Sequence, residues 1–590
     1  MAAREFARVA PGRAKFSLVL VVALGAILSV RLGNLQIVQA PHLSSLALGQ
    51  HAETVQSFAR RGSILDREGG VLVRSLPSES VVADPTLVSD PRAAAEKLAR
   101  ALGAKPVVIE AALRERSRFV YLQRKVSHDV ADRVRALDLE GVFTRSEETG
   151  KRFFTSGRLA SSVIGYVGTD ENGLGGLEYT FDSLLRGKPG RIRVETDNFG
   201  RAIPFAETRV VEKAAPGRSI VTTIDPYLQY QAERLLHADV AKWHARSATA
   251  IVMDPWTGEL LAVANVPDFE PARYGAFPQD AWRNRAIADA YEPGSTFKLI
   301  TVAAALESGR VPAGMRFPSR DALEVGGRVI HNAEDGFLAG SGSTESMEDV
   351  IAYSHNVGAA EIGIATGPRA MYRTMRAFGF GDPTAIELSG ENPGIVLSPK
   401  DWSGSTLATI AFGHSVSVTP LALIRAYAAI ANGGTLMRPR IISAIAGPDG
   451  ATVYKYAPAI ERRRVISERT AATLRKYLRA VVVRGTGNPS ARVPGYTTAG
   501  KTGTAQVVEN GRYEPGAYIA SFVGMIPAEK PRYVVLVKVE RPQGAIYGSV
   551  VAAPVFAELA RAAMLHAGVM PAAPPSPRLV RHAAVAKAAR

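Results

Sequence analysis

Cysteine is absent from the 590-residue chain. Its absence excludes disulfide bonds, zinc ribbons and catalysis by a thiol, and it leaves the cellular compartment open. The chain also has no Gly-x-Ser-x-Gly motif, which weakens an α/β-hydrolase, and no His-Glu-x-x-His motif, which would indicate a zinc site. We therefore expect neither a metal nor a cofactor.

Acidic residues are fewer than basic ones. The chain has 71 Lys and Arg against 55 Asp and Glu, a formal net charge of +16. The basic residues are spread along the chain, and no basic stretch is interleaved with aromatic residues, so we do not expect nucleic-acid binding. Attraction to anionic membrane or cell-wall polymers is the remaining interpretation. The composition is that of an ordinary globular protein, and the length indicates two or three domains.

Long apolar runs are also scarce, and one lies close to the N-terminus. Residues 1–15 carry four basic residues and one acidic residue, and a mainly apolar stretch over 16–38, interrupted by Arg31, follows them. A spanning helix needs about 20 residues, so this stretch is long enough. A cleavable signal peptide is the alternative, but Pro41 would hinder cleavage after Ala40. We expect an uncleaved single-pass anchor, with residues 1–15 in the cytoplasm and the remaining chain outside.

Residues 39–215 mix short strand-like and helix-like patterns. Residues 63–73 read as a strand, an Asp-Arg-Glu-Gly-Gly turn and a second strand, which is a hairpin pattern. Ala, Leu, Glu and Arg at helical spacing predict helical structure over 90–140. Glycine-rich turns and strand-like runs fill 141–215. The region offers no convergent acid, base and nucleophile.

The pattern changes at residue 216, where a second domain, residues 216–568, is expected to begin. A strand over 219–224 leads into a helix over 227–241, because Asp225 is a good N-cap and Pro226 suits the first helical position.

The end of this domain is rich in strand-forming residues, in three runs separated by turns: 502–508, 518–525 and 533–540. We expect them to form an antiparallel sheet against which helices from 295–425 pack, which is an α+β fold. Residues 569–590 are rich in Pro and basic residues and are expected to form a disordered tail.

The strongest local signal is the segment 291–298, Tyr-Glu-Pro-Gly-Ser-Thr-Phe-Lys. Apolar residues at helical spacing up to Gly309 predict a helix that starts at Ser295, with Lys298 one turn later on the same face. A serine hydroxyl needs a base to become a good nucleophile, and burial can lower the pKa of a lysine enough to make it that base. Taken alone, Ser-x-x-Lys is more often a serine N-cap followed by an exposed lysine.

Two later segments strengthen the catalytic interpretation. Ser354-His355-Asn356 lies in a polar break between helix-like runs, and the tetrapeptide 501–504, Lys-Thr-Gly-Thr, opens a strand. A hydroxyl and an amide can relay a proton and hold a substrate amide. The Lys-Thr-Gly strand offers a cation for a carboxylate, hydroxyl groups and an edge backbone.

In this order, Ser-x-x-Lys, Ser-x-Asn and Lys-Thr-Gly resemble the three active-site motifs of penicillin-binding proteins and serine β-lactamases. Residues 61–67, Arg-Gly-Ser-Ile-Leu-Asp-Arg, and 173–178, Gly-Leu-Gly-Gly-Leu-Glu, are similar to motifs of the pedestal domain of class B penicillin-binding proteins. Further class B landmarks extend the resemblance over roughly residues 15–565.

This resemblance implies an N-terminal membrane helix, an elongated mixed α/β pedestal (dimerisation-type) domain over 39–215, and a transpeptidase domain like the serine β-lactamases over 216–568. The run 283–287, Arg-Asn-Arg-Ala-Ile, and the compact length are most similar to the division-specific branch, with the elongation branch as the alternative.

The resemblance also implies roles for single residues. Ser295 would attack the D-Ala-D-Ala end of a peptidoglycan stem peptide, Lys298 would be its base, and Ser354 would pass the proton to the leaving D-alanine. Backbone N–H groups of Ser295 and Thr504 would form the oxyanion hole. The implied substrate-binding residues are Asn356, Lys501, Thr502, Gly503 and Thr504.

The same resemblance implies peptidoglycan cross-linking in septal wall synthesis at the bacterial inner membrane, inhibition by β-lactams, and a membrane-embedded glycan polymerase and division proteins as partners. Two segments depart from the family pattern. Gly413-His414-Ser415 stands where the division branch often has Gly-Tyr-Gly, and residues 154–157, Phe-Thr-Ser-Gly, replace Tyr-Pro-x-Gly in the pedestal.

Other functions fit less well. Residues 495–502 match Gly-x4-Gly-Lys-Thr, the phosphate-binding loop, but that loop must open a helix, and residues 503–508 favour a strand. A secreted β-lactamase would not need the anchor and pedestal. A β-lactam sensor should have more than one span, and an inactive scaffold need not keep Ser295 and Lys298.

Overall fold

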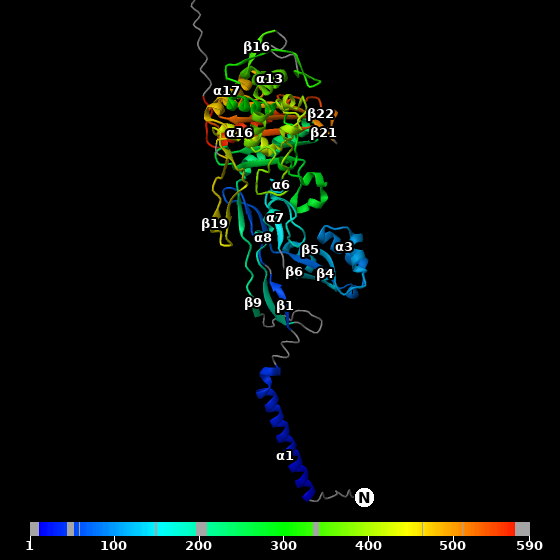
Figure 1. Ribbon diagram of the computed structural model, residues 1–590. Helices are drawn as coiled ribbons and strands as arrows, with labels where there is room; N and C mark the ends of the chain where they lie inside the picture. Colours follow the sequence, from blue (N-terminus) through cyan, green and yellow to red (C-terminus); the bar gives the residue numbers. More distant parts are fainter. Residues whose placement is uncertain are drawn as a thin grey trace, which may run out of the picture. The chain divides into compact units, whose positions relative to one another are not determined.

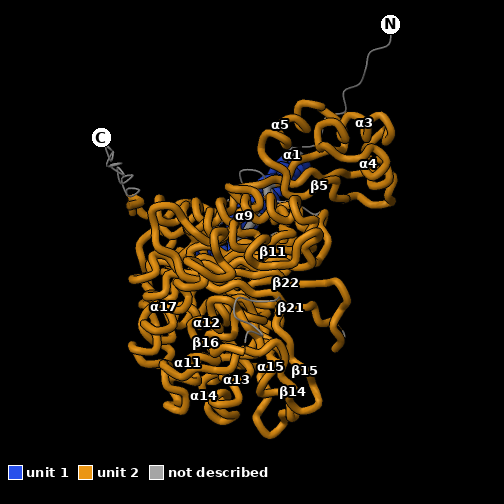
Figure 2. Tube along the Cα trace, turned by 90° about the horizontal axis from the view of Figure 1, so that it is seen from above, with its two compact units in different colours: residues 1–59, 188–216 blue, residues 60–187, 217–590 orange. Residues whose placement is uncertain are grey.

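The structure, a computed structural model, describes residues 11–43, 52–57, 59–147, 150–195, 209–333, 342–462, 464–509 and 511–572. The chain divides into two units, residues 1–59 with 188–216 and residues 60–187 with 217–590 (Figure 2). Most of the two predicted tails, 1–15 and 569–590, lies outside the described residues.

The first unit holds the apolar N-terminal segment and a small sheet. Helix α1 (Pro11–Gly33) continues through a π-helical turn, η1 (Asn34–Val38). Lys15–Val38 is long and apolar enough to cross a membrane, and it is the one such helix within the described ranges. The antiparallel sheet has the strand order β1-β8-β9, with bounds Ala52–Ser57, Gly190–Glu195 and Arg209–Glu212.

Residues 79–146 of the second unit form a sheet covered by helices. The strand order is β5-β4-β6 (Val120–Val126, Glu79–Ala83 and Val142–Ser146), and the helices are α3 (Pro91–Leu102), α4 (Pro106–Leu113) and α5 (His128–Arg135). The prediction of helical structure throughout 90–140 is therefore wrong at β5. Its sequence, Val-Tyr-Leu-Gln-Arg-Lys-Val, is rich in strand formers, and pairing with β4 buries the valines at both ends.

A six-stranded sheet joins the two predicted domains. Its order is β19-β18-β10-β2-β3-β7, and Ile64 of β2 pairs in parallel with Ile220 of β10. The predicted hairpin is confirmed as β2 and β3, and β10 leads into α9 with Asp225 as the N-cap. The strands are Thr452–Lys455, Ile442–Ala446, Ser219–Thr222, Ile64–Leu65, Val71–Leu76 and Lys151–Phe154.

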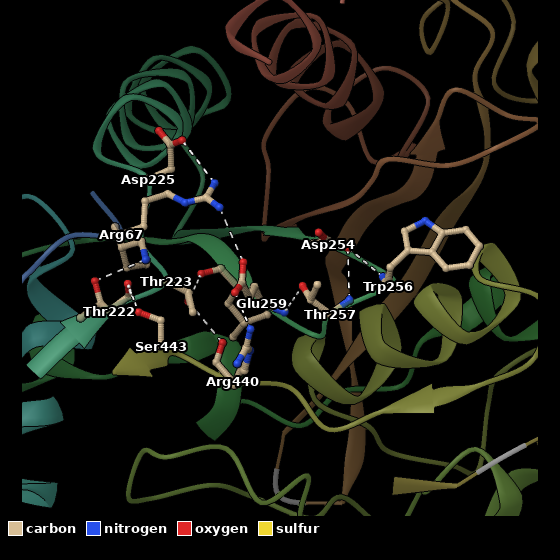
Figure 3. A network of polar contacts seen from close by, with 12 residues as sticks. Arg67, Thr222, Thr223, Asp225, Asp254, Trp256, Thr257, Glu259, Arg440 and Ser443 are labelled. Carbon is tan, nitrogen blue, oxygen red and sulfur yellow. Dashed lines mark hydrogen bonds and ion pairs between the residues drawn. The ribbon is translucent and has the colours of Figure 1, made fainter. Parts of the chain in front are cut away.

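Charged side chains cross this junction (Figure 3). The guanidinium of Arg67, in the β2–β3 turn, lies 3.8 Å from a carboxylate oxygen of Asp225 and 3.6 Å from one of Glu259. The other oxygen of Glu259 accepts a hydrogen bond of 2.5 Å from Arg440. The hairpin of the first predicted domain is thus tied to residues of the second by charge as well as by strand pairing.

The largest part of the second unit is built around an antiparallel sheet, as predicted, and this sheet has five strands (Figure 1). The three predicted β-rich runs are β21, β22 and β23. The order is β12-β11-β23-β22-β21, so β21 lies at the edge. The strands are Leu260–Val266, Ser247–Met253, Tyr533–Glu540, Arg512–Ile526 and Ala499–Glu509.

Helices cover both faces of this sheet. Alternate residues of β23 enter two separate cores, with Val535 and Val537 in one and Val534 and Leu536 in the other. The first core also contains residues of α9 (Pro226–Trp243) and α18 (Ala552–His566), and the second contains residues of α11 (Lys298–Ser308) and α16 (Pro420–Ala431). This period-2 alternation is what a strand buried on both faces requires.

The remaining helices and strands are shorter or lie at the rim of the sheet. The helices are α6 (Ser161–Ile164), α7 (Gly176–Thr180), α8 (Asp182–Arg186), α10 (Arg285–Ala288), α12 (Met347–Tyr353), α13 (Asn356–Thr366), α14 (Pro368–Ala377), α15 (Thr406–Ile410) and α17 (Glu468–Arg484). The strand pairs are β13 (Arg316–Pro318) with β16 (Thr344–Ser346), β14 (Ala322–Val325) with β15 (Arg328–His331), and β17 (Leu436–Met437) with β20 (Ile460–Arg462). The 3₁₀ turns are η2 (Pro85–Leu87), η3 (Pro271–Ala276), η4 (Gln279–Trp282), η5 (Gly294–Phe297) and η6 (Pro399–Asp401).

Glu178 of α7 is a fully buried acid that holds the pedestal motifs together. One of its oxygens accepts hydrogen bonds from Arg61 at 2.8 and 2.6 Å, and the other accepts one from Arg152 at 2.7 Å. Both guanidinium groups are themselves buried. Removing the acid would take the carboxylate partner from buried Arg152 and leave Arg61 with Asp182, 2.8 Å away, as its remaining acid, which is a large destabilisation.

We expect Glu178→Ala to lower the free energy of unfolding by about 3–5 kcal/mol, measured by chemical denaturation. Glu140→Ala, which removes an exposed acid of the same region, is the control and should change it by less than about 0.5 kcal/mol. Equal, small changes in both variants would contradict a structural role for Glu178.

Candidate active site

The serine predicted as nucleophile lies on a tight turn. Ser295 is in η5, which runs directly into α11, so a 3₁₀ turn precedes the predicted helix. The turn is fixed by its neighbours, since Gly294 N–H donates to the carbonyl of Gly413 at 3.1 Å and the Tyr427 hydroxyl donates to the carbonyl of Thr296 at 2.8 Å. Ser295 is half-buried, whereas the residues on either side of it are buried.

Lys298 is fully buried at the start of α11. Its Nζ donates to the carbonyl of Ser354 at 2.5 Å and to Oδ1 of Asn356 at 2.8 Å, and it lies 3.2 Å from the Ser354 hydroxyl. Burial lowers the pKa of Lys298 well below its ordinary value. The positive charge of Lys501 lowers it further, and the negative charge of Glu345 opposes both effects. A neutral amine at this position can accept a proton.

Ser354 and Asn356 lie on a turn between two helices. Ser354 ends α12 with a left-handed φ of 63°, a conformation that is uncommon for a residue with a side chain. Asn356 begins α13, and Oδ1 of Asn332 accepts from the N–H groups of Asn356 and Val357 at 2.8 and 3.1 Å. Sequence reasoning missed Asn332, because no local pattern links it to a helix that starts 24 residues later.

The Lys-Thr-Gly-Thr segment lies on the edge strand β21. Lys501 is fully buried, its Nζ lies 3.2 Å from both the carbonyl and the hydroxyl of Thr502, and burial lowers its pKa to about 7. The Thr502 hydroxyl is also 2.8 Å from that of Thr486, and the Thr504 hydroxyl accepts from the N–H of Gly548 at 3.4 Å.

Gly503 lets the strand approach the serine turn. A Cβ at this position would lie 2.4 Å from the Ser521 hydroxyl and 2.9 Å from a methyl carbon of Thr296. A Cβ on Gly294, on the other side of the contact, would lie 2.8 Å from the carbonyl oxygen of Thr504. Glycine at both positions therefore allows the serine turn and the edge strand to meet.

The structure thus brings the three predicted segments together. Hydrogen bonds join Lys298 to Ser354 and Asn356, and close packing joins the Ser295 turn to Gly503 and Thr504. The arrangement combines a hydroxyl, a buried amine with a lowered pKa, a second hydroxyl and a strand edge. No group of three or more potential metal ligands occurs in the part of the chain that the structure describes. The match to a phosphate-binding loop is excluded, because its Gly-Lys-Thr lies inside β21 and opens no helix.

His414, in the segment that departs from the family pattern, contacts two polar side chains next to the serine turn. Its Nδ1 lies 3.0 Å from a carboxylate oxygen of Glu292 and 3.1 Å from the hydroxyl of Tyr513, which donates to the same oxygen at 3.0 Å. The other oxygen of Glu292 accepts from the N–H of Ser415 at 2.8 Å. A cavity of about 570 Å³ adjoins these residues and is lined in part by Glu292, Ser415 and Lys538.

Family models and individual relatives all indicate the same protein family for this chain. The model of the penicillin-binding protein transpeptidase domain matches residues 248–561, and the model of the penicillin-binding protein dimerisation domain matches residues 56–222. The chain is 35% identical to stage V sporulation protein D of Bacillus subtilis, over 95% of this chain and 86% of the relative. It is 34% identical to the peptidoglycan D,D-transpeptidase FtsI of Escherichia coli, over 85% of this chain and 82% of that relative.

A solved structure extends the similarity to the fold. Penicillin-binding protein 3 from Mycobacterium tuberculosis, complexed with ampicillin, superposes with a TM-score of 0.68 at 29% identity, covering 89% of this chain and 99% of the other. The chain belongs to the class B penicillin-binding proteins and is similar to their FtsI members. The family, the α+β fold and the transpeptidase class predicted from the sequence are confirmed.

Proposed function

We propose that the protein is a peptidoglycan D,D-transpeptidase that works through an acyl-enzyme on Ser295. The hydroxyl of Ser295 attacks the carbonyl carbon of the penultimate D-alanine of a stem peptide, and its proton passes to the neutral amine of Lys298. The terminal D-alanine leaves with a proton passed through Ser354, and the amine of a neighbouring peptide then displaces Ser295 to form the cross-link. The observation that carries the proposal is the buried Lys298 amine in contact with the Ser354 hydroxyl.

The other predicted residues would bind the substrate. In its protonated form Lys501, with the hydroxyls of Thr502 and Thr504, would hold the terminal carboxylate, and Asn356 would hold the peptide amide. In the structure Oδ1 of Asn356 accepts from Lys298, and Nδ2 of Asn356 donates to the carbonyl of His331 at 3.0 Å. Asn356 therefore also holds the turn between α12 and α13 in place. The backbone N–H groups of Ser295 and Thr504 would stabilise the oxyanion of the tetrahedral intermediate.

A fluorescent penicillin should label the full-length protein covalently, because β-lactams acylate the same serine. We expect Ser295→Ala to abolish labelling, detected on denaturing gels. Lys298→Ala should slow acylation by about 10³-fold or more while the fold survives, since the hydroxyl loses its base. Ser308→Ala, at the other end of α11, is the control and should label normally. Labelling of Ser295→Ala would assign the nucleophile elsewhere.

The lowered pKa of Lys501 predicts a pH dependence. Below about 7 the amine is protonated and holds the carboxylate, and above about 7 the charge is lost, so kcat/KM for acylation should fall as pH rises through this value. Lys501→Arg keeps a cation at all these pH values and should remove the falling limb even if the rate is lower. A falling limb that persists in Lys501→Arg would show that another group titrates.

We further propose that α1 anchors the protein in the bacterial inner membrane, with the N-terminus inside and the catalytic domain outside. Basic residues before the apolar run support this orientation. The similarity to FtsI supports a role in septal wall synthesis, with a membrane-embedded glycan polymerase and division proteins as partners; an elongation role is the second candidate.

Localisation of a fluorescent fusion in growing cells distinguishes the two roles. We expect a band at mid-cell in dividing cells, because a septal enzyme works where the new wall closes. Patches along the side wall throughout growth would contradict the septal role and favour elongation.

A further inference from the structure

A buried acid and a buried histidine lie directly behind the Ser354–Asn356 turn, and the proposed mechanism assigns them no role. Glu345 is in β16, at the start of the segment that leads through α12 to Ser354, and His355 is the middle residue of the turn. Nδ1 of His355 lies 2.5 Å from Oε2 of Glu345, and both side chains are 2% exposed.

The fold leaves room for this pair and fixes it from several sides. A Cβ on Gly358 of α13 would lie 2.4 Å from Oε1 of Glu345, so the absence of a side chain there admits the carboxylate. The backbone N–H of His355 donates to the carbonyl of Val350 at 3.2 Å. The imidazole also stacks on Tyr353, with ring centroids 6.0 Å apart. The pair therefore ties β16, α12 and α13 to the turn that holds Lys298.

The hydrogen bonds indicate which partner carries charge. Nε2 of His355 is buried and has no hydrogen-bond partner in the part of the chain that the structure describes. A proton on Nε2 would be a buried donor without an acceptor, which costs more than an unused lone pair. Nδ1 is therefore the nitrogen that donates to Oε2 of Glu345, and the negative charge of Glu345 acts on Lys298.

This charge faces a site with two buried amines. Lys298 of α11 and Lys501 of β21 are both fully buried, and Glu345 is the acid whose charge favours protonation of Lys298. Among the described residues, the charged groups near the pair include Glu361 of α13, whose pKa is raised in part by the charge of Glu345, and Arg320, which lies 3.6 Å from Glu361.

We propose that Glu345 and His355 are positioning residues that hold the Ser354–Asn356 turn against Lys298 and supply the negative charge that lets Lys298 take up the serine proton during acylation. The inference rests on the proposed function, in which Lys298 is the base. It predicts that the charge of Glu345, and not its shape alone, sets the pH range of acylation.

The test is the pH profile of acylation of the full-length protein by a fluorescent penicillin. Glu345→Gln keeps the shape and removes the charge, so protonated Lys298 becomes less stable. The rising acidic limb should move to lower pH by roughly 1 unit, the size of shift that the loss of one nearby opposite charge produces. The maximal rate should fall several-fold, because the amine is a weaker base.

Three variants separate charge from structure. Glu345→Asp keeps the charge and should leave the acidic limb where the wild type has it, even at a lower rate. Glu361→Gln removes a nearby acid that does not contact the turn and should leave the limb unchanged. A fall in rate for Glu345→Gln without movement of its limb, or an equal movement in Glu361→Gln, overturns the proposal.

If Glu345→Gln does not fold, the histidine provides the same test. His355→Ala removes the side chain that joins Glu345 to the turn, so the effect of the Glu345 charge on Lys298 should weaken and the limb should again move to lower pH. His355→Asn, whose amide can donate from a similar position, should keep it. A limb that stays in place in His355→Ala overturns the proposal. Failure of the wild type to be acylated would instead contradict the proposed function itself.

Discussion

The burial of one amine shapes the catalytic half of the molecule. Lys298 has no access to solvent, so its Nζ must find its hydrogen-bond partners in the protein, and the three described partners come from the turn of Ser354 and Asn356. An ammonium group in such a place is costly, and the neutral form is favoured. The same burial that lowers the pKa of Lys298 also joins the start of α11 to the turn between α12 and α13, which is remote in the sequence.

The turn that receives this amine is held by residues outside the reacting groups. Ser354 has a left-handed backbone, which persists only where the surroundings determine it. Asn332 accepts a hydrogen bond from the first N–H of α13, and His355 contacts Glu345 of β16. Residues that precede the turn in the sequence therefore hold it in place. Across the site, glycines at 294 and 503 bring the serine turn and the edge strand into contact. The positions of the predicted site residues therefore depend on the packing and hydrogen bonds of the residues behind them.

Much of the architecture could be predicted from local patterns. The structure confirms three such predictions: the strand runs near the C-terminus, the Asp225 N-cap and the 63–73 hairpin. They are predicted from strand-forming residues, from helix-capping residues and from turn residues, respectively. The meeting of the three motifs could be expected only from their order and their resemblance to a family. Roles that depend on distant partners carry no local signal. No pattern near Asn332 links it to α13, and the sequence of β5 is expected to be part of a helical stretch, whereas in the structure it pairs with β4.

The six-stranded sheet contains strands from both predicted domains, so the two domains share one set of backbone hydrogen bonds. Strand β10, which opens the second predicted domain, has β2 of the first as its parallel neighbour on one side and β18 on the other. A fragment that begins at residue 217 would carry β10 with one row of backbone groups unpaired, a surface prone to self-association. Exchange of catalytic domains between relatives would have to bring the 64–76 hairpin along with it, so the two regions are expected to diverge in evolution as one piece.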